Sequence, residues 1–387
     1  MQTIYLDNNA TTQPAEEVVA AMDAALHDLW QNPSSTHRAG QRVRRHVDLA
    51  RQAVAELIGC KDRQIIFTCG GTEADNMAVF GTLEAYPERG VLVTSRTEHD
   101  AIRDAVEHAS GQGAEVVWLP LDGDGVVDCN ALGELLQRRG TEIAVVSIMW
   151  ANNETGVIQP IETIGNLCRE HEVLFHTDAV QWVGKMPTNV ADLPIDMMSF
   201  SGHKFHGPKG VGALYVRRGI RLAKRSHGGS QERDRRGGTE NVPGILGLGA
   251  AAKTAQAWLA TPERERLGAL RDRFAQSILD MVDDARVNSA GAERMWNTAS
   301  IGFRGLEADA IILVLSEHGI CASAGAACAS GSLEPSPILL AMGVEEAYAH
   351  GSVRFSLSRY TTEAEIDRAL EVVPEVVAKL RRSMAGG

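Results

Sequence analysis

Residues 173–178 read VLFHTD, and residues 197–204 read MMSFSGHK. Each stretch is an apolar run that ends in polar residues, and runs this apolar are typical of strands buried on both faces of a parallel sheet. Further runs of this kind occupy residues 64–68, 90–94, 144–149 and 212–216. Helical patterns separate them, so the sequence predicts an α/β domain with a mostly parallel sheet.

The clearest helical pattern covers residues 42–58, where apolar side chains recur on one side. Gly59 follows it as a C-terminal stop, and a shorter helix is expected at residues 161–171. Active sites in sheets of this type lie beyond the carboxyl ends of the strands. We therefore look for functional residues where the strands end.

The pattern changes after Val242. Residues 245–281 are rich in Ala, Leu, Arg and Glu and predict a long helix with a break at Pro262. Strands are expected at 298–303 and 353–356, and helices at 308–318 and from 363 to about 382. These elements predict a smaller α+β domain made of residues 1–13 and 256–387, beside a large domain of residues 14–255.

Composition excludes several classes of protein. The formal net charge of -12 repels phosphate backbones, so nucleic acid is not an expected partner. No apolar run reaches the roughly 18 residues that span a bilayer, and the N-terminus lacks the pattern of a signal peptide. We expect a cytoplasmic protein. Its six cysteines include no C-x-x-C pair, so no structural metal site is predicted.

Lys204 and Asp178 follow predicted strands. Burial lowers the pKa of a lysine and makes its amine a nucleophile that can form a Schiff base. Pyridoxal phosphate also needs a carboxylate beside its ring nitrogen, and Asp178 at a strand end suits that need. The alternatives from local sequence are a solvated loop lysine and an aspartate that caps a helix.

A phosphate site is indicated at residues 67–74, where a strand, a glycine pair, the hydroxyl of Thr72 and a helix follow one another. Backbone N–H groups at a helix N-terminus bind phosphate. The pair Gly70-Gly71 lacks the full G-x-G-x-x-G pattern, which disfavours a dinucleotide. The alternative is a tight turn with Thr72 as a cap.

Cys328 lies in residues 323–332, where no side chain is larger than cysteine. A thiol on a tether of small residues suits a nucleophile that moves between two positions. The alternative is a free surface cysteine. The other five cysteines lie in or beside regular elements and are interpreted as core or incidental residues.

From about residue 4 to the C-terminal helix, the chain resembles cysteine desulfurases of the NifS/IscS type, which are class V aminotransferase-like enzymes of pyridoxal-phosphate fold type I. The matching stretches are residues 5–12, 32–37, 72–76, 98–99, 152–156, 176–181, 202–204, 237–241 and 353–356. Several motifs in the right order are far more specific than any one of them. The resemblance implies a large domain with a mostly parallel sheet and a smaller α+β domain.

The resemblance also implies a role for each matching residue. The implied cofactor is pyridoxal 5'-phosphate, bound covalently by Lys204, with Asp178 at the ring nitrogen, His99 stacked on the ring and Gln181 at the ring hydroxyl. The implied phosphate contacts are Thr72, Ser201, His203 and, from a second subunit, Thr239. The implied substrate contacts are Arg354, Asn9 and Asn153, and Cys328 would receive the sulfur, with His99 as its general base.

The implied reaction converts L-cysteine to L-alanine and leaves a persulfide on Cys328. The implied setting is a homodimer that passes sulfur to an iron-sulfur scaffold protein of the NifU or IscU kind. Residues 330–336 and 355–362 resemble NifS more than IscS, which suggests nitrogenase maturation, whereas Cys69, Gly70, Gly238 and Ala326 depart from the usual pattern. The alternatives are a selenocysteine lyase, another class V enzyme, or a non-catalytic sulfur carrier.

Overall fold

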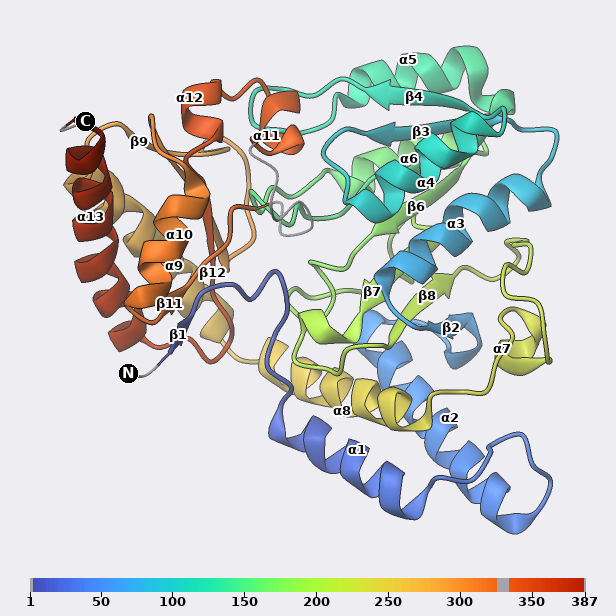
Figure 1. The fold of residues 1–387 in the computed structure, drawn as a ribbon. Coiled ribbons are helices and arrows are strands. Elements are labelled where there is room, and N and C mark those ends of the chain that lie inside the picture. The colour runs from blue at the N-terminus through green and yellow to red at the C-terminus, as the bar shows by residue number, and fades with distance from the viewer. Residues whose placement is uncertain (1–2, 326–333, 386–387) are drawn as a thin grey trace.

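The computed structural model describes residues 3–325 and 334–385. Within these residues a seven-stranded sheet has the order β2-β8-β7-β6-β5-β3-β4 (Figure 1). Its strands are β2 Ile65–Thr68, β3 Val91–Ser95, β4 Glu115–Leu119, β5 Ile143–Ser147, β6 Leu174–Asp178, β7 Met197–Ser201 and β8 Gly212–Val216. Only β8 runs antiparallel to its neighbours in this described sheet, so the prediction of a mostly parallel sheet is confirmed.

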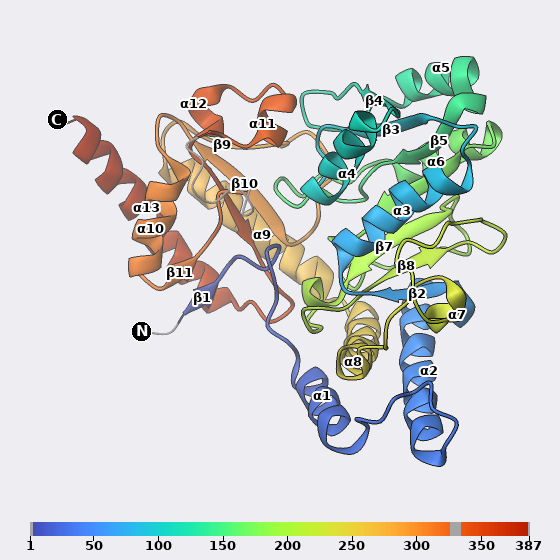
Figure 2. The same ribbon diagram turned by 45° about the vertical axis from the view of Figure 1, so that its right-hand side comes forward.

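Helices cover both faces of this sheet. The described helices of this part are α1 Glu16–Asp28, α2 Arg38–Ile58, α3 Gly71–Ala85, α4 Asp100–Gly111, α5 Cys129–Arg139, α6 Ile161–Glu170, α7 Gln231–Asp234 and α8 Val242–Leu259, with short 3-10 turns η1 Asp62–Gln64, η2 Gly140–Glu142 and η3 Gly202–Lys204. Figures 1 and 2 show α3 and α4 on one face, with α2 and α8 on the other.

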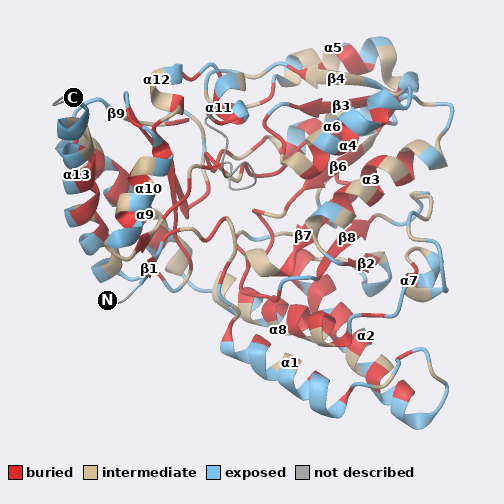
Figure 3. Cartoon of the chain, viewed as in Figure 1, coloured by how far each residue is buried: buried red, intermediate tan, exposed pale blue. Residues whose placement is uncertain are grey.

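Alternating side chains of the strands fill the two layers between sheet and helices, because successive strand residues point to opposite faces. Ile65 and Phe67 of β2 belong to the core that contains Val47 of α2, whereas Ile66 belongs to the core that contains Met77 of α3. The central strands are therefore buried on both sides, as Figure 3 shows.

The smaller part of the fold has its own hydrophobic core. Its elements are β1 Ile4–Tyr5, α9 Glu263–Met281, β9 Ala285–Val287, β10 Thr298–Phe303, α10 Ala308–Glu317, β11 Ile320–Cys321, α11 Pro337–Ala341, α12 Glu346–Ala349, β12 Ser352–Ser356 and α13 Glu363–Ala385. Leu6 is buried in this core with Phe274 and Phe355. The N-terminal segment thus packs with residues far away in sequence, although the domain boundary between residues 255 and 256 stays a prediction.

Most predicted elements match the structure within a few residues, and the predicted break at Pro262 separates α8 from α9. The sequence analysis missed β4. This strand begins with exposed Glu115, and the next three residues are only half-buried, so it lacks the apolar run of a central strand. None of the described helices has both the length and the apolar character needed to cross a membrane.

Gly59 ends α2 in a left-handed conformation with φ 71°, which confirms the predicted stop. A Cβ at this position would lie 2.0 Å from Oδ1 of Asn189. We expect Gly59→Ala to lower the free energy of unfolding by more than the ~1 kcal/mol cost of left-handed backbone alone. Urea unfolding measures this, with Gly90→Ala as the control because a Cβ there meets open space. Equal midpoints for the two variants would contradict the assignment.

Candidate active site

The carboxyl ends of β2, β3, β5, β6 and β7 lie at one edge of the sheet, because these strands run in the same direction. This edge carries the turn before α3, His99 after β3, Asp178 at the end of β6 and Lys204 after β7. Residues that the sequence separates by more than a hundred positions are therefore brought together, as predicted for a parallel sheet.

Lys204 lies partly buried in η3, directly after β7. Its Nζ donates hydrogen bonds to the backbone carbonyls of Asn9, at 2.6 Å, and Ala10, at 2.9 Å. Lys204 also lines a cavity of about 150 Å³ together with His99 and Arg354. The alternative of a fully solvated loop lysine is therefore wrong.

Asp178 is buried, with 4% of its surface exposed. Its Oδ1 accepts a hydrogen bond from the backbone N–H of Val180 at 2.8 Å, but no helix begins at this turn. Burial raises the pKa of Asp178, whereas the charges of His99 and Lys204 act in the opposite direction. A buried carboxylate of this kind is stabilised by a cationic partner such as a protonated ring nitrogen.

His99 forms the N-cap of α4, and its Nδ1 accepts a hydrogen bond from the backbone N–H of Ala101 at 3.0 Å. An acceptor nitrogen carries no proton, so the neutral ring holds its proton on Nε2. In this arrangement Nε2–H can donate a hydrogen bond, but the lone pair of Nδ1 is occupied by the cap. The predicted role of His99 as a general base would require it to give up the cap.

Behind Asp178, a hydrogen-bonded row of buried side chains crosses three strands. The ring of His176 contacts Ser147 Oγ on β5 and Ser199 Oγ on β7, both at 2.9 Å, and Asp75 of α3 lies 3.7 Å from the ring. Burial lowers the pKa of His176 to about 3 and raises the pKa of Asp75 well above its usual range. His176 is thus uncharged near neutral pH, and burial favours the protonated form of Asp75 over its carboxylate.

Asn9 uses both N–H groups of its side chain within the protein. Its Nδ2 donates to the carbonyl of Asn153 at 3.1 Å and to Thr298 Oγ1 at 2.9 Å. Its Oδ1 accepts from Asn297 and Lys185, and its carbonyl accepts from Gln181. Asn9 therefore supports the site, and its occupied amide does not favour the direct substrate contact that the resemblance implied.

Arg354 of β12 is 2% exposed and faces the same cavity. Its Nη2 donates to Asp7 Oδ1 at 2.7 Å, and its Nη1 donates to the carbonyls of Asn153 and Gly325. Among the described residues, neither its Nε nor Asn153 Oδ1 has a hydrogen-bond partner, although both atoms are buried. Buried polar groups without a partner are unusual, and both residues line this cavity.

The expected phosphate site is only partly assembled in one chain. Gly70 precedes α3, and a Cβ at Gly70 would meet only Ser201 Oγ, 4.0 Å away. Thr72 lies exposed in the first turn of α3. His203 contacts Thr11 Oγ1 at 3.1 Å, and burial together with nearby lysines lowers its pKa to about 4. Thr239 is exposed and makes no described contact with these residues, so its predicted role in a second subunit stays a prediction.

Cys328 lies outside the described residues, but both flanks of its segment are described. Gly325, Pro337 and Ile338 line the cavity that also contains Lys204. On one flank the carbonyl of Gly325 contacts Arg354, and on the other Ser336 Oγ donates to buried Glu154 at 2.6 Å. The described residues on both sides of Cys328 in sequence, Gly325 and Pro337, therefore lie at the wall of this cavity.

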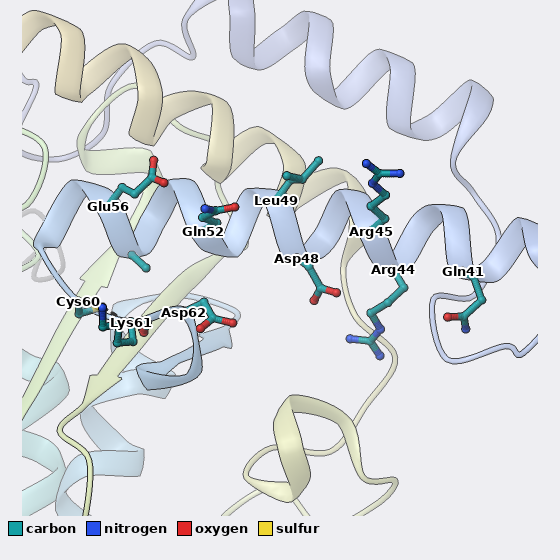
Figure 4. A pocket seen from close by; sticks show the side chains of 11 residues that line it. Gln41, Arg44, Arg45, Asp48, Leu49, Gln52, Glu56, Cys60, Lys61 and Asp62 are labelled. Carbon is teal, nitrogen blue, oxygen red and sulfur yellow. Dashed lines mark hydrogen bonds between the residues drawn. The ribbon is translucent and has the colours of Figure 1, made fainter.

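A larger groove of about 710 Å³ lies elsewhere, along α2. Figure 4 shows side chains of α2, among them Arg44 and Asp48, together with the turn at Cys60–Asp62. None of its lining residues lines the cavity at Lys204. Arg44 also pairs with buried Glu240 at 2.9 Å, which connects the groove to the segment of Thr239.

The sequence profile of the aminotransferase class-V family matches residues 4–369. The chain belongs to this family. It is 49% identical to a protein named cysteine desulfurase 2 from Trichormus variabilis, over 98% of this chain and 94% of that protein. This confirms the resemblance to cysteine desulfurases.

Solved structures of class V relatives share the fold. A NifS-like protein matches with a TM-score of 0.91 and 34% identity, over 98% of this chain and 100% of that one. A structure described as SspA in complex with cysteine matches with a TM-score of 0.81 and 32% identity, over 93% and 100% of the two chains. The predicted fold type I architecture is therefore confirmed.

His176 gives this class V chain a predictable response to acid. A histidine whose folded pKa is lowered binds fewer protons than in the unfolded chain, so stability falls as pH drops below about 6.5. Between about pH 6 and pH 4, we expect the free energy of unfolding to fall less steeply in His176→Gln than in the parent. The difference in slope should be up to about 1.4 kcal/mol per pH unit. Urea midpoints across this range measure the slope. An unchanged slope in His176→Gln would contradict this prediction.

Proposed function

We propose that this chain is a pyridoxal-phosphate-dependent cysteine desulfurase that converts L-cysteine to L-alanine and receives the sulfur on Cys328. One observation carries the proposal: Gly325 and Pro337, which precede and follow Cys328 in the sequence, both line the cavity that contains Lys204. A thiol carried between these two residues suits the transfer of sulfur from a substrate bound at Lys204. The cysteine desulfurases among its relatives, and the class V structure that contains cysteine, support the same substrate.

The residues present fit pyridoxal phosphate. Lys204 supplies the amine, buried Asp178 supplies a carboxylate, and the N-terminus of α3 beside Gly70 offers backbone N–H groups and open space for a phosphate. When bound, the cofactor acts as an electron sink that makes the substrate Cα proton acidic and weakens the Cβ–S bond. Asp178, Gln181, His99, Thr72, Ser201 and His203 are the residues that would hold it.

The side chains of the cavity divide the remaining work. Arg354 and Asn153 bind and orient the substrate carboxylate, for which a guanidinium is well suited. Lys204 Nζ, held by two backbone carbonyls, moves the Cα proton. The Cys328 thiolate attacks the substrate sulfur, so that an S–S bond forms while the Cβ–S bond breaks and Cβ takes a proton. The products are a persulfide on Cys328 and L-alanine.

A selenocysteine lyase or another class V enzyme remains the second candidate. Such an enzyme shares the lysine chemistry but needs no cysteine on a segment beside the site. The position of residues 325 and 337 on the cavity favours the desulfurase.

We also propose a cytoplasmic homodimer whose phosphate sites are completed by Thr239 of the partner subunit. Arg236 of this segment pairs with Glu73 of the same chain at 2.8 Å, whereas Thr239 is exposed and makes no described contact with the phosphate residues of its own chain, which leaves it available to a partner subunit. Large apolar side chains are exposed on α1, just after it and on α2: Val19, Leu26, Trp30 and Leu49. An interface with a second subunit would cover apolar surface of this kind.

The sulfur acceptor would be an iron-sulfur scaffold protein of the NifU or IscU kind. The NifS-like residues 330–336 and 355–362 support a role in nitrogenase maturation. A sulfide and alanine assay with L-cysteine, repeated with candidate scaffold proteins, tests both statements.

Variants of Lys204 and Cys328 should fail in different ways. We expect Lys204→Ala to lose the covalent bond to the cofactor and the Cα proton transfer, because its amine performs both. We expect Cys328→Ala to bind cofactor and change its visible spectrum with L-cysteine, yet to release alanine at less than about 1% of the parent rate, as for other lost nucleophiles. Stopped-flow spectra with alanine quantification measure both. Turnover of Cys328→Ala at the parent rate would exclude the persulfide mechanism.

A composite site makes a prediction about mixed dimers. Thr239→Glu should repel the cofactor phosphate, and Lys204→Ala should remove the amine, so each homodimer should be inactive. Refolding the two variants together should restore activity, because one site then combines intact Lys204 with intact Thr239 of the partner subunit. Activity assays on separate and mixed samples measure this. Inactive mixtures, in which sedimentation nevertheless shows dimers, would place Thr239 outside the partner's site.

A further inference from the structure

Lys185 is a buried lysine that the sequence analysis did not assign. It lies in the turn after β6 and is 5% exposed. Its Nζ donates hydrogen bonds to Gln181 Oε1 at 2.7 Å and to Asn9 Oδ1 at 3.1 Å. No carboxylate among residues 3–325 and 334–385 forms an ion pair with it. A buried lysine without a counter-charge is rare, which indicates a function.

The surroundings of Lys185 favour an uncharged amine. An ammonium group has three N–H donors, but the site offers two amide oxygens, which two donors of a neutral amine satisfy. Burial, followed by the charges of Lys204 and Arg354, lowers the pKa of Lys185 well below its usual range. Three other titratable groups lie near Lys185. His206 and Arg359 line the same small cavity as Lys185, and His203 and His206 are close enough to interact with it electrostatically.

Lys185 determines which way the amide of Gln181 points. Because Gln181 Oε1 accepts from Lys185, its nitrogen lies on the opposite side, where Nε2 donates to the carbonyl of Asn9 at 3.0 Å. The same carbonyl accepts the hydrogen bond from Lys204 Nζ at 2.6 Å. The second N–H of Gln181 is therefore held close to the amine that would carry the cofactor.

We propose that Lys185 is an uncharged positioning residue that fixes the amides of Gln181 and Asn9, so that an N–H of Gln181 faces the ring oxygen of a pyridoxal cofactor bound at Lys204. The inference rests on the proposed function for its cofactor, but the charge of Lys185 is testable without it.

The first experiment compares Lys185→Met with Lys209→Met, an exposed lysine two residues beyond Gly207. A lysine whose folded pKa is lowered binds fewer protons than in the unfolded chain, so its contribution to stability rises with pH until about pH 10. We expect the urea midpoint of the parent, relative to Lys185→Met, to rise between about pH 7 and pH 9. The Lys209→Met difference should stay constant. A constant difference for Lys185→Met as well would show that Lys185 is charged and overturn the proposal.

The second experiment titrates the visible absorption of the bound cofactor with pH. Loss of an N–H donor at the ring oxygen destabilises its negative charge, so the proton on the linkage nitrogen is held more tightly. We expect the midpoint to rise by about one pH unit, a tenfold change in proton affinity, in Lys185→Met but not in Lys209→Met. Gln181→Leu should give the same rise, and the double variant should add nothing to it.

The outcomes separate the two proposals. A parent protein that gives no cofactor spectrum contradicts the proposed function, while the urea experiment still decides the charge of Lys185. A normal spectrum with unshifted midpoints in Lys185→Met, or shifts that add in the double variant, overturns the positioning role alone. If Lys185→Met does not fold, Gln181→Leu carries the test: its midpoint must rise, since an unchanged value would mean that no N–H of Gln181 reaches the ring oxygen.

Discussion

The arrangement of the site depends on the hydrogen bonds of one residue, Asn9. Its backbone and side chain bind the sheet edge through Gln181, Lys185 and Lys204, and the smaller core through Thr298 and Ser356. Each bond alone contributes only about 1 kcal/mol, but a buried polar group that loses its partner costs more. The N-terminal segment therefore holds the two parts of the fold in one geometry at the point where Lys204 emerges.

Burial shifts the pKa of several groups around this point, beside the ion pair of Arg354 with Asp7. Asp75 and Glu98 lie near Asp178, and burial raises the pKa of each well above its usual range. On the other side burial lowers the pKa of Lys185. Like charges close together are unfavourable in a medium of low polarity, so burial favours the uncharged forms of these groups.

The sequence predicted the strands and the residues at their ends because both depend on local pattern. Asp178 and Lys204 close apolar runs, and the carboxyl ends of parallel strands share one edge. The sequence analysis missed Lys185 and the fully hydrogen-bonded side chain of Asn9. A lysine that follows a glycine is typical of a surface turn, and only the fold shows that the N-terminal segment covers Lys185. The sequence also did not show that His99 Nδ1 caps α4, a contact that only the fold reveals and that opposes the role of His99 as a base.

Arg354 connects this rigid centre to the segment of Cys328. Its backbone pairs with Ser323, and its guanidinium binds both Gly325 and Asn153, which lies in a turn after β5. Asn153 in turn accepts a hydrogen bond from Asn9, so the chain of contacts runs from Lys204 through Asn9 to Arg354. The residue expected to bind the substrate carboxylate therefore also binds Gly325, the last described residue before Cys328. This chain of buried hydrogen bonds fixes the position of Gly325 relative to the amine of Lys204, which the proposed transfer of sulfur to Cys328 requires.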